Sequence, residues 1–382
     1  MRLKGPLERR GVETVVILPQ EAGDAAARLR VEGVDVAQMP MRRLRATADP
    51  RVQLHFLATL RKDLNRLSAL IADRGIDVVQ VHGATNPQGA IAARKQGAAV
   101  VWQLFDTRAP MVLRRMAMPL VVGLADAMTV WGRELVRVHP GAERLGERLT
   151  TVYPPVDPAE FAPASSASRD EARAELGVPP DAELVGSVGV LNPQKGHEHL
   201  IRAAELVREQ HENVYFRVLG GASPAHATYE RSLRNELEAR GLADRFEFVD
   251  PKDSVARLMQ AFDVFAMTSV PRSEGMPTVI LEAMMCGKPV VTTDVGAVRE
   301  LVEIGVSGLV VEPLRPELIA AALGRLLGDE KLRERIGEAA RSRAQSEFSL
   351  DRLADRHVAA YRQAIDHRRK RLEAYGRSRH PA

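Results

Sequence analysis

Two glutamates, Glu274 and Glu282, flank the start of a short apolar segment that carries the punctuation of a helix. Pro277 has the fixed φ that suits a first helical turn, and the Gly-Lys-Pro sequence at residues 287–289 is a helix stop. We therefore predict a helix over residues 278–286. The start of a helix presents unpaired backbone N–H groups that bind phosphate. The segment that would form this phosphate site consists of Gly275, Met276, Pro277 and Thr278.

The spacing of the two glutamates suits a ligand with hydroxyl groups on both sides of its phosphates. Glu274 lies in the predicted loop, and Glu282 lies about one turn inside the predicted helix. One carboxylate can reach the sugar end of a bound nucleotide sugar and the other its ribose, and each would accept hydrogen bonds from paired hydroxyls. The alternative is that both are ordinary solvated residues, because glutamates at this spacing also occur by chance.

The elements that must position these residues alternate between short β-branched runs and longer helical segments. This alternation is typical of parallel sheets covered by helices. A proline-rich segment, residues 154–168, interrupts it once and reads as an exposed connector. The predicted strands are residues 14–18, 34–38, 77–81, 99–104, 127–130 and 150–153 before the connector, and 184–190, 214–219, 245–249, 264–267, 289–293 and 309–311 after it.

This pattern predicts an α/β protein with two Rossmann-like, doubly wound domains, which suits a length of 382 residues. We place the N-terminal, acceptor-side domain at residues 1–155 and the C-terminal, nucleotide-sugar-binding domain at residues 156–345. Residues 346–382 form a C-terminal helix and basic tail, which we expect to return toward the N-terminal domain.

Composition excludes several classes of protein. Cys286 is the single cysteine, so an internal disulfide framework and a cysteine-based metal cluster are ruled out. No carboxylates or histidines cluster with metal-ligand spacing, and the glycine spacing of a nicotinamide fingerprint is missing. No apolar run has the length of a membrane span or signal peptide. We therefore expect a cytoplasmic protein with no metal, no resident cofactor and no nucleic-acid partner.

The charge is distributed unevenly along the chain. Residues 1–150 contain 23 Lys+Arg and 15 Asp+Glu, a net charge of +8, whereas the remainder contains 31 and 35, a net charge of −4. Two stretches of the basic half, residues 39–51 and 111–124, combine apolar side chains with arginines. Such mixtures can dock on anionic lipid, which would make the protein peripheral at the inner face of the membrane. The alternative is buried helices with solvated arginines.

Residues 273–291 resemble the Glu, seven residues, Glu motif of glycosyltransferase family 4, also called glycosyl transferases group 1. The motif reads Ser-Glu-Gly-Met-Pro-Thr-Val-Ile-Leu-Glu-Ala-Met-Met-Cys-Gly-Lys-Pro-Val-Val. Segments with family-like sequence and spacing surround it, and the resemblance runs from about residue 185 to residue 348. The family is retaining and has the GT-B fold, in which two Rossmann-like domains face each other across a cleft.

The resemblance implies a role for each matching residue. Lys195 would lie over the donor diphosphate and offset the charge on the leaving group. Asp106, with His82 and Arg108, would lie at the sheet edge on the acceptor side, and residues 248–250 would lie near the nucleotide base. The implied catalytic residues are therefore Glu274, Lys195 and Asp106, and the donor-binding residues are Lys195, Gly275, Met276, Pro277, Thr278 and Glu282.

The implied reaction is metal-independent transfer, with retention, from a nucleotide-diphosphate sugar to an unidentified glycan, lipid-linked or small-molecule acceptor. Three features depart from the family pattern. Val190 and Phe105 replace a common arginine and histidine, and the first strand with its glycine-rich loop is not recognisable. A late start, a shortened chain or a lost strand could explain the last departure. Two alternatives follow: a non-catalytic nucleotide-sugar binder or scaffold, and a GT-B phosphorylase or epimerase.

Overall fold

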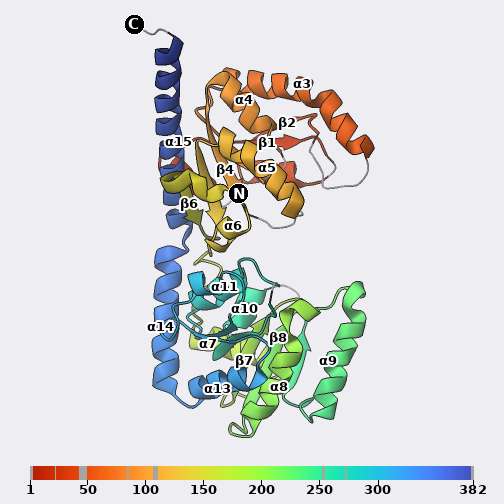
Figure 1. Ribbon diagram of the computed structural model, residues 1–382. Coiled ribbons are helices and arrows are strands. Elements are labelled where there is room, and N and C mark those ends of the chain that lie inside the picture. The colour runs from red at the N-terminus through yellow and green to blue at the C-terminus, as the bar shows by residue number, and fades with distance from the viewer. Residues whose placement is uncertain are drawn as a thin grey trace. The chain divides into compact units, whose positions relative to one another are not determined.

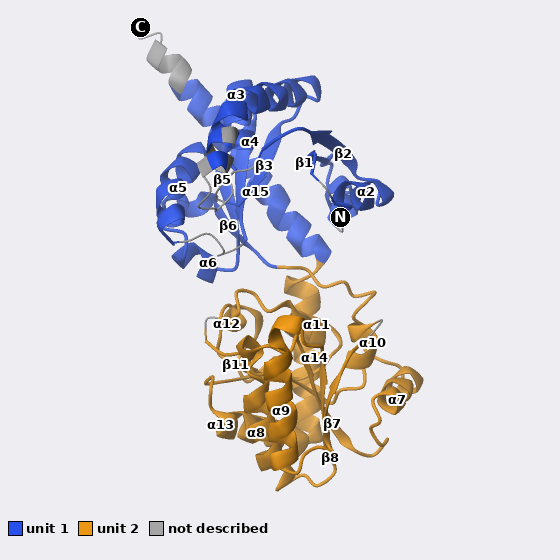
Figure 2. Ribbon diagram, turned by 90° about the vertical axis from the view of Figure 1, so that its right-hand side faces the viewer, with its two compact units in different colours: residues 1–153, 350–382 blue, residues 154–349 orange. Residues whose placement is uncertain are grey.

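The computed structural model describes residues 3–21, 23–42, 50–83, 86–105, 111–251, 254–271 and 273–379. The chain divides into two compact units (Figure 2). Unit 1 comprises Met1–Tyr153 and Leu350–Ala382, and unit 2 comprises Pro154–Ser349. Every pair of strands in the described residues is parallel, as the apolar runs alternating with helices predict.

Unit 2 contains one six-stranded sheet of order β12-β11-β10-β7-β8-β9. The chain winds outward from β7 in one direction and from β10 in the other, so the strand order reverses between these two strands. Such a reversal is where open α/β sheets bind ligands, outside the carboxyl ends of the strands. The strands are β7 (Glu183–Val188), β8 (Val214–Leu219), β9 (Phe246–Val249), β10 (Val264–Met267), β11 (Val290–Thr293) and β12 (Leu309–Val311).

The core of unit 2 forms where helices cover this sheet. All four residues of both β10 and β11 are buried, as expected of strands that lie inside a parallel sheet. Phe216 on β8 and Leu200 on α8 belong to one apolar cluster between the sheet and the helices. The helices (Figure 1) are α7 (Ser166–Glu175), α8 (His197–Arg208), α9 (Ala227–Ala239), α10 (Val255–Met259), α11 (Thr278–Met285), α12 (Val298–Leu301), α13 (Pro316–Leu327) and α14 (Glu330–Glu347), with short 3₁₀ helices η2 (Pro193–Lys195) and η3 (Pro224–His226).

Unit 1 contains two sheets, β1-β2 and β3-β4-β5-β6. The strands are β1 (Val15–Pro19), β2 (Asp35–Met39), β3 (Val78–His82), β4 (Ala99–Leu104), β5 (Ala127–Trp131) and β6 (Leu149–Val152). The helices are α1 (Lys4–Glu8), α2 (Ala25–Val31), α3 (Pro50–Asp73), α4 (Gln88–Gln96), α5 (Met111–Leu124), α6 (Glu134–Arg137) and the 3₁₀ helix η1 (Ala142–Arg148).

The last helix, α15 (Leu350–Arg379), packs on the four-stranded sheet of unit 1. Its Ala364 shares an apolar cluster with Ala99 and Val101 of β4. Its basic end reaches the fully buried Asp126, whose Oδ1 lies 3.0 Å from both Arg371 Nη1 and His367 Nδ1. The predicted basic tail is thus partly an ion-pair partner of the sheet. No helix in the described parts of the chain is long and apolar enough to cross a membrane.

Candidate functional site

The predicted site residues of unit 2 gather at the point where its strand order reverses. Lys195 follows β7, and Glu274 follows β10, the strand that pairs with β7. Parallel neighbouring strands bring their carboxyl ends to one edge of the sheet. The two residues therefore meet there although 79 positions separate them in the sequence.

Lys195 is held by a tight turn between β7 and α8. The side chain of Asn192 accepts a hydrogen bond from the Lys195 backbone N–H at 3.2 Å, and Gly196 has a positive φ of 63°. A Cβ at Gly196 would lie 2.3 Å from the Thr268 carbonyl oxygen, so only glycine fits. Thr268 Oγ1 donates to the carbonyl oxygens of Lys195 and Gly196, at 3.2 and 3.0 Å. The end of β10 thus fixes the turn that carries Lys195.

Glu274 forms a partly buried network with a cation and a hydroxyl group. Lys195 Nζ lies 2.6 Å from Glu274 Oε1, and Ser269 Oγ donates to the same oxygen at 2.8 Å. The side chains of Glu274 and Lys195 are 10% and 24% exposed, so the pair is shielded from bulk water while one side stays open. Ser269 is held in turn by Thr293, whose Oγ1 donates to the Ser269 carbonyl at 2.7 Å.

The loop between Glu274 and α11 contacts the backbone of a second loop, at residues 296–297. Ala297 N–H donates to the Gly275 carbonyl at 3.0 Å. Gly296 has a φ of +54°, and a Cβ there would lie 2.5 Å from the Glu274 carbonyl oxygen. The close approach of these two loops therefore requires glycine at position 296.

The predicted phosphate segment leads directly into α11. This helix begins at Thr278 and ends at Met285, close to the predicted 278–286, and Gly287 follows it with a φ of +72°. Pro277 is its N-cap residue, one position before the predicted first helical turn. Gly275 and Thr278 are exposed, whereas Met276 is half-buried and Pro277 is buried. The first N–H groups of a helix have no partner within the helix, and this helix start follows Glu274, which lies at the carboxyl edge of the sheet.

The other predicted residues are Glu282, Asp106, Arg108 and the segment 248–250. Glu282 is half-buried on α11, one turn beyond the helix start. Asp106 and Arg108 lie outside the described residues. Val190 is 55% exposed in the turn after β7, and Phe248 is 7% exposed, packed in the core of unit 2. That residues 248–250 lie near the nucleotide base stays a prediction.

His197 follows the same turn as the first residue of α8, and it was not among the predicted site residues. Its buried ring places Nε2 3.2 Å from the Val190 carbonyl oxygen and packs edge-on against Phe248, with ring centroids 6.3 Å apart. Burial lowers the pKa of His197 to about 4, because desolvation disfavours the imidazolium form. Neutral His197, with its proton on Nε2, can therefore donate to Val190 and restrain the Lys195 turn.

Four further residues support the site, although they were not among the predicted site residues: Thr268, Ser269, Thr293 and Gly296. Hydroxyl residues after apolar strands are common, so their types alone carry little signal. Their roles depend on which strands are neighbours, which is a property of the sheet order.

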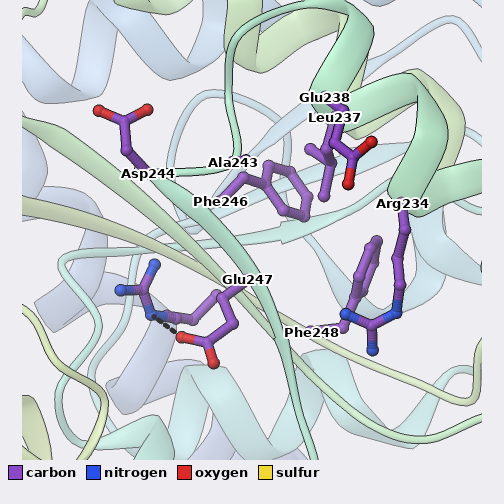
Figure 3. A pocket seen from close by; sticks show the side chains of 9 residues that line it. Arg234, Leu237, Glu238, Ala243, Asp244, Phe246, Glu247 and Phe248 are labelled. Atoms are coloured by element: carbon purple, nitrogen blue, oxygen red, sulfur yellow. Dashed lines mark ion pairs between the residues drawn. The ribbon is translucent and has the colours of Figure 1, made fainter.

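A pocket of about 270 Å³ lies beside the outermost strand of the sheet, between β9 and α9 (Figure 3). Its cations already have partners: Arg217 Nε lies 3.5 Å from Glu247, and Arg234 pairs with Glu230 at 2.8 Å and lies over the Phe248 ring. β9 is the last strand in the order, two positions from β7, so this pocket does not lie at the reversal between β7 and β10. We therefore do not take it as the site. The described residues include no group of three or more His, Cys, Asp or Glu that could hold a metal ion.

Sequence comparison identifies relatives of known family. Residues 168–343 match the family described as Glycosyl transferases group 1. The D-inositol 3-phosphate glycosyltransferase of Corynebacterium urealyticum is 33% identical over 254 residues, which cover 65% of this chain and 59% of the relative. The enzyme of that name from Acidothermus cellulolyticus is 36% identical over 258 residues, which cover 65% and 56%. The chain thus spans less than two thirds of the length of these curated relatives.

Solved structures extend the likeness to nearly the whole chain. A glycosyltransferase from Rickettsia africae matches with a TM-score of 0.76 at 16% identity, covering 95% of this chain and 93% of that one. Anabaena Alr3699/HepE, solved in complex with UDP, matches with a TM-score of 0.74 at 23% identity, covering 94% of each chain. Identities this low show the fold alone, the GT-B architecture of two Rossmann-like domains. Residues 168–343 therefore form a domain of the glycosyl transferases group 1 family, on a chain with the GT-B fold.

Proposed function

We propose that this chain transfers a sugar from a nucleotide-diphosphate sugar to an acceptor, with retention of configuration and without a divalent metal. The observation that carries this proposal is the contact of Lys195 Nζ with Glu274 Oε1, 2.6 Å apart, beside the N-terminus of α11. The cation and the start of the helix suit the diphosphate of such a donor, and the carboxylate suits its sugar hydroxyls.

In the proposed complex the diphosphate lies between Lys195 and the segment Gly275–Thr278. The Lys195 ammonium has three protons, and Glu274 accepts only one of them, so the others can bind phosphate oxygens. Positive charge at this place stabilises the leaving diphosphate as the glycosidic bond breaks. Because Lys195 and the helix start supply that charge, the proposed reaction needs no metal ion.

Glu274 is proposed to bind sugar hydroxyls and so orient the anomeric carbon. Its Oε1 accepts hydrogen bonds from Lys195 and Ser269, which hold the carboxylate in position in a partly buried place. Glu282 is proposed to accept from the ribose. Retention would follow from attack on the face that the diphosphate leaves, with a phosphate oxygen taking the acceptor proton. Asp106 stays a proposed acceptor-side residue.

The donor and acceptor classes to test come from the relatives. HepE was solved with UDP-glucose, and several curated relatives are named D-inositol 3-phosphate glycosyltransferases. The experiment incubates the protein with UDP-, GDP- and ADP-sugars, each with D-inositol 3-phosphate or lipid-linked acceptors, and follows nucleoside diphosphate release. NMR of the product then reports the anomeric configuration.

Transfer with retention, unchanged in EDTA, supports the proposal. Loss of activity in EDTA and its rescue by a metal ion contradict the metal-independent mechanism. An inverted product contradicts retention. Consumption of free phosphate identifies a phosphorylase, and a changed sugar with no acceptor identifies an epimerase. Donor binding without turnover across a broad acceptor panel favours the non-catalytic alternative.

A further inference from the structure

Helix α5 of unit 1 exposes an almost entirely apolar face. Residues at positions i, i+1, i+4, i+5, i+8, i+9 and i+12 fall on one side of a helix. In α5 these are the exposed residues Met111, Val112, Arg115, Met116, Pro119, Leu120 and Gly123. Only Arg115 among them is charged. The exposed fractions of Val112 and Met116 are 70% and 74%, so large apolar side chains here stand in solvent over about three turns.

The buried side of α5 contains a charged residue. Arg114 is buried, with 7% of its surface exposed, and its Nη1 donates to the Val138 carbonyl oxygen at 2.7 Å. Met118 and Val121 complete the buried side. An ordinary surface helix buries its apolar residues and exposes its charges. α5 instead buries one arginine and exposes Met116, a pattern that sets its outer face apart as a contact surface.

We infer that this face of α5 docks on an anionic lipid surface, a property that goes beyond the proposed transfer reaction and does not depend on it. Amphipathic helices bind membranes by burying apolar side chains at the headgroup boundary while basic residues contact anionic lipids. The face of α5 fits this chemistry. It carries Arg115, the helix contains no Asp or Glu, and residues 1–150 have a net charge of +8, from 23 Lys+Arg and 15 Asp+Glu.

A second copy of the chain fits the face less well. Fourteen residues of helix extend about 21 Å, and a strip about 10 Å wide along them covers roughly 200 Å². A stable protein interface buries about 800 Å² on each partner. The α5 face is thus too small for a stable dimer, whereas a membrane needs only shallow insertion of a few side chains.

The test is co-sedimentation of the full chain with two kinds of vesicle. One contains equal parts phosphatidylglycerol and phosphatidylcholine, and the other contains phosphatidylcholine alone. We expect binding to the anionic vesicles only, weakened by 0.5 M salt. Met116→Glu should reduce the partition coefficient about tenfold or more, because a charge replaces an apolar side chain that would insert among the lipids. Arg115→Gln should reduce it about fivefold.

Val31→Glu is the matched control, since Val31 on α2 is 86% exposed and lies off this face. It should bind as the unchanged chain does, and all variants should keep their melting temperature. The inference is overturned if the unchanged chain stays in solution with both vesicle types, if it binds both types equally, or if Met116→Glu binds as well as Val31→Glu. A dimer that Met116→Glu dissociates in the absence of vesicles would assign the face to self-association instead.

Discussion

Lys195 Nζ and Glu274 Oε1 lie 2.6 Å apart across two neighbouring strand ends of unit 2. The pair places one positive and one negative group at the reversal of the strand order. Each helps to hold the other in position: the cation stabilises the carboxylate, and the carboxylate orients the ammonium. Their arrangement therefore determines how a donor would be bound and how its leaving group would be stabilised.

Lys195→Ala should lower kcat about 10²- to 10³-fold, the loss typical when one stabilising donor to a developing negative charge is removed. The measurement is the rate of nucleoside diphosphate release at saturating donor. Lys331→Ala is the control, because Lys331 is exposed on α14. Equal rates for the two variants would remove Lys195 from the catalytic machinery.

Ser269→Ala should lower activity about tenfold with a small change in melting temperature. Ser269 Oγ donates to Glu274 Oε1 at 2.8 Å, and a hydrogen bond to a charged group contributes roughly 1.5–3 kcal/mol. The loss should be larger in kcat than in the KM of the nucleotide, since Glu274 is assigned to the sugar. A variant that keeps full activity would show that the carboxylate needs no hydroxyl partner. Ser346→Ala, on the exposed side of α14, is the control.

Gly296→Ala should destabilise unit 2 and reduce donor binding. The new Cβ would lie 2.5 Å from the Glu274 carbonyl oxygen at a φ of +54°. Gly305→Ala is the matched control, because Gly305 has a φ of +78° but nothing within 4 Å of its Cβ position. The control should cost about 1 kcal/mol from backbone conformation alone, and Gly296→Ala clearly more. Equal free energies of unfolding would mean that the loop can move aside.

His197 should make stability depend on pH in a defined direction. Its pKa falls from 6.5 to about 4 on folding, so the unfolded chain binds the extra proton between these values. Stability is therefore highest above pH 6.5 and falls as the pH drops toward 4, by up to about 3 kcal/mol. Urea unfolding at several pH values should show a flatter profile for His197→Gln. Parallel profiles for the two proteins would contradict a buried, neutral His197.

Asp126→Asn should destabilise unit 1 by about 3 kcal/mol, because it removes the buried carboxylate that the partly buried cations of Arg94 and Arg371 contact. Asp126 is fully buried, and its carboxylate lies within 3.5 Å of Arg94, His367 and Arg371. Asp366→Asn is the control, since that carboxylate is exposed beside Arg369 on α15. Denaturant unfolding measures the difference. A variant as stable as the control would show that α15 is held by its apolar contacts alone.

The sequence could predict the elements because each is encoded locally. The strands at 99–104, 214–219, 264–267 and 309–311 have the predicted bounds, since buried parallel strands read as continuous apolar runs. The helix from Thr278 was predicted from the proline and glycine at its ends. The prediction of two α/β halves followed from the alternation of strands and helices, which restarts after the connector at residues 154–168.

What could not be predicted depends on contacts between distant residues. The division of unit 1 into two sheets and the hydrogen bond from Thr293 to the Ser269 carbonyl follow from strand order, which no local pattern encodes. The burial of Arg114 was likewise missed, because residues 111–124 suggested solvated arginines on a buried helix. The carbonyl oxygen of Val138 accepts from Arg114 and so offsets part of the desolvation cost of its guanidinium.

The most direct test of the donor site is calorimetric titration of the protein with UDP, GDP and ADP. The account predicts that one of them binds, that Lys195→Ala weakens its affinity at least about tenfold, a change of roughly 1.4 kcal/mol, and that Lys331→Ala leaves it unchanged. No binding of any nucleoside diphosphate, or equal binding by both variants and the unchanged chain, would contradict a donor site at Lys195 and Glu274.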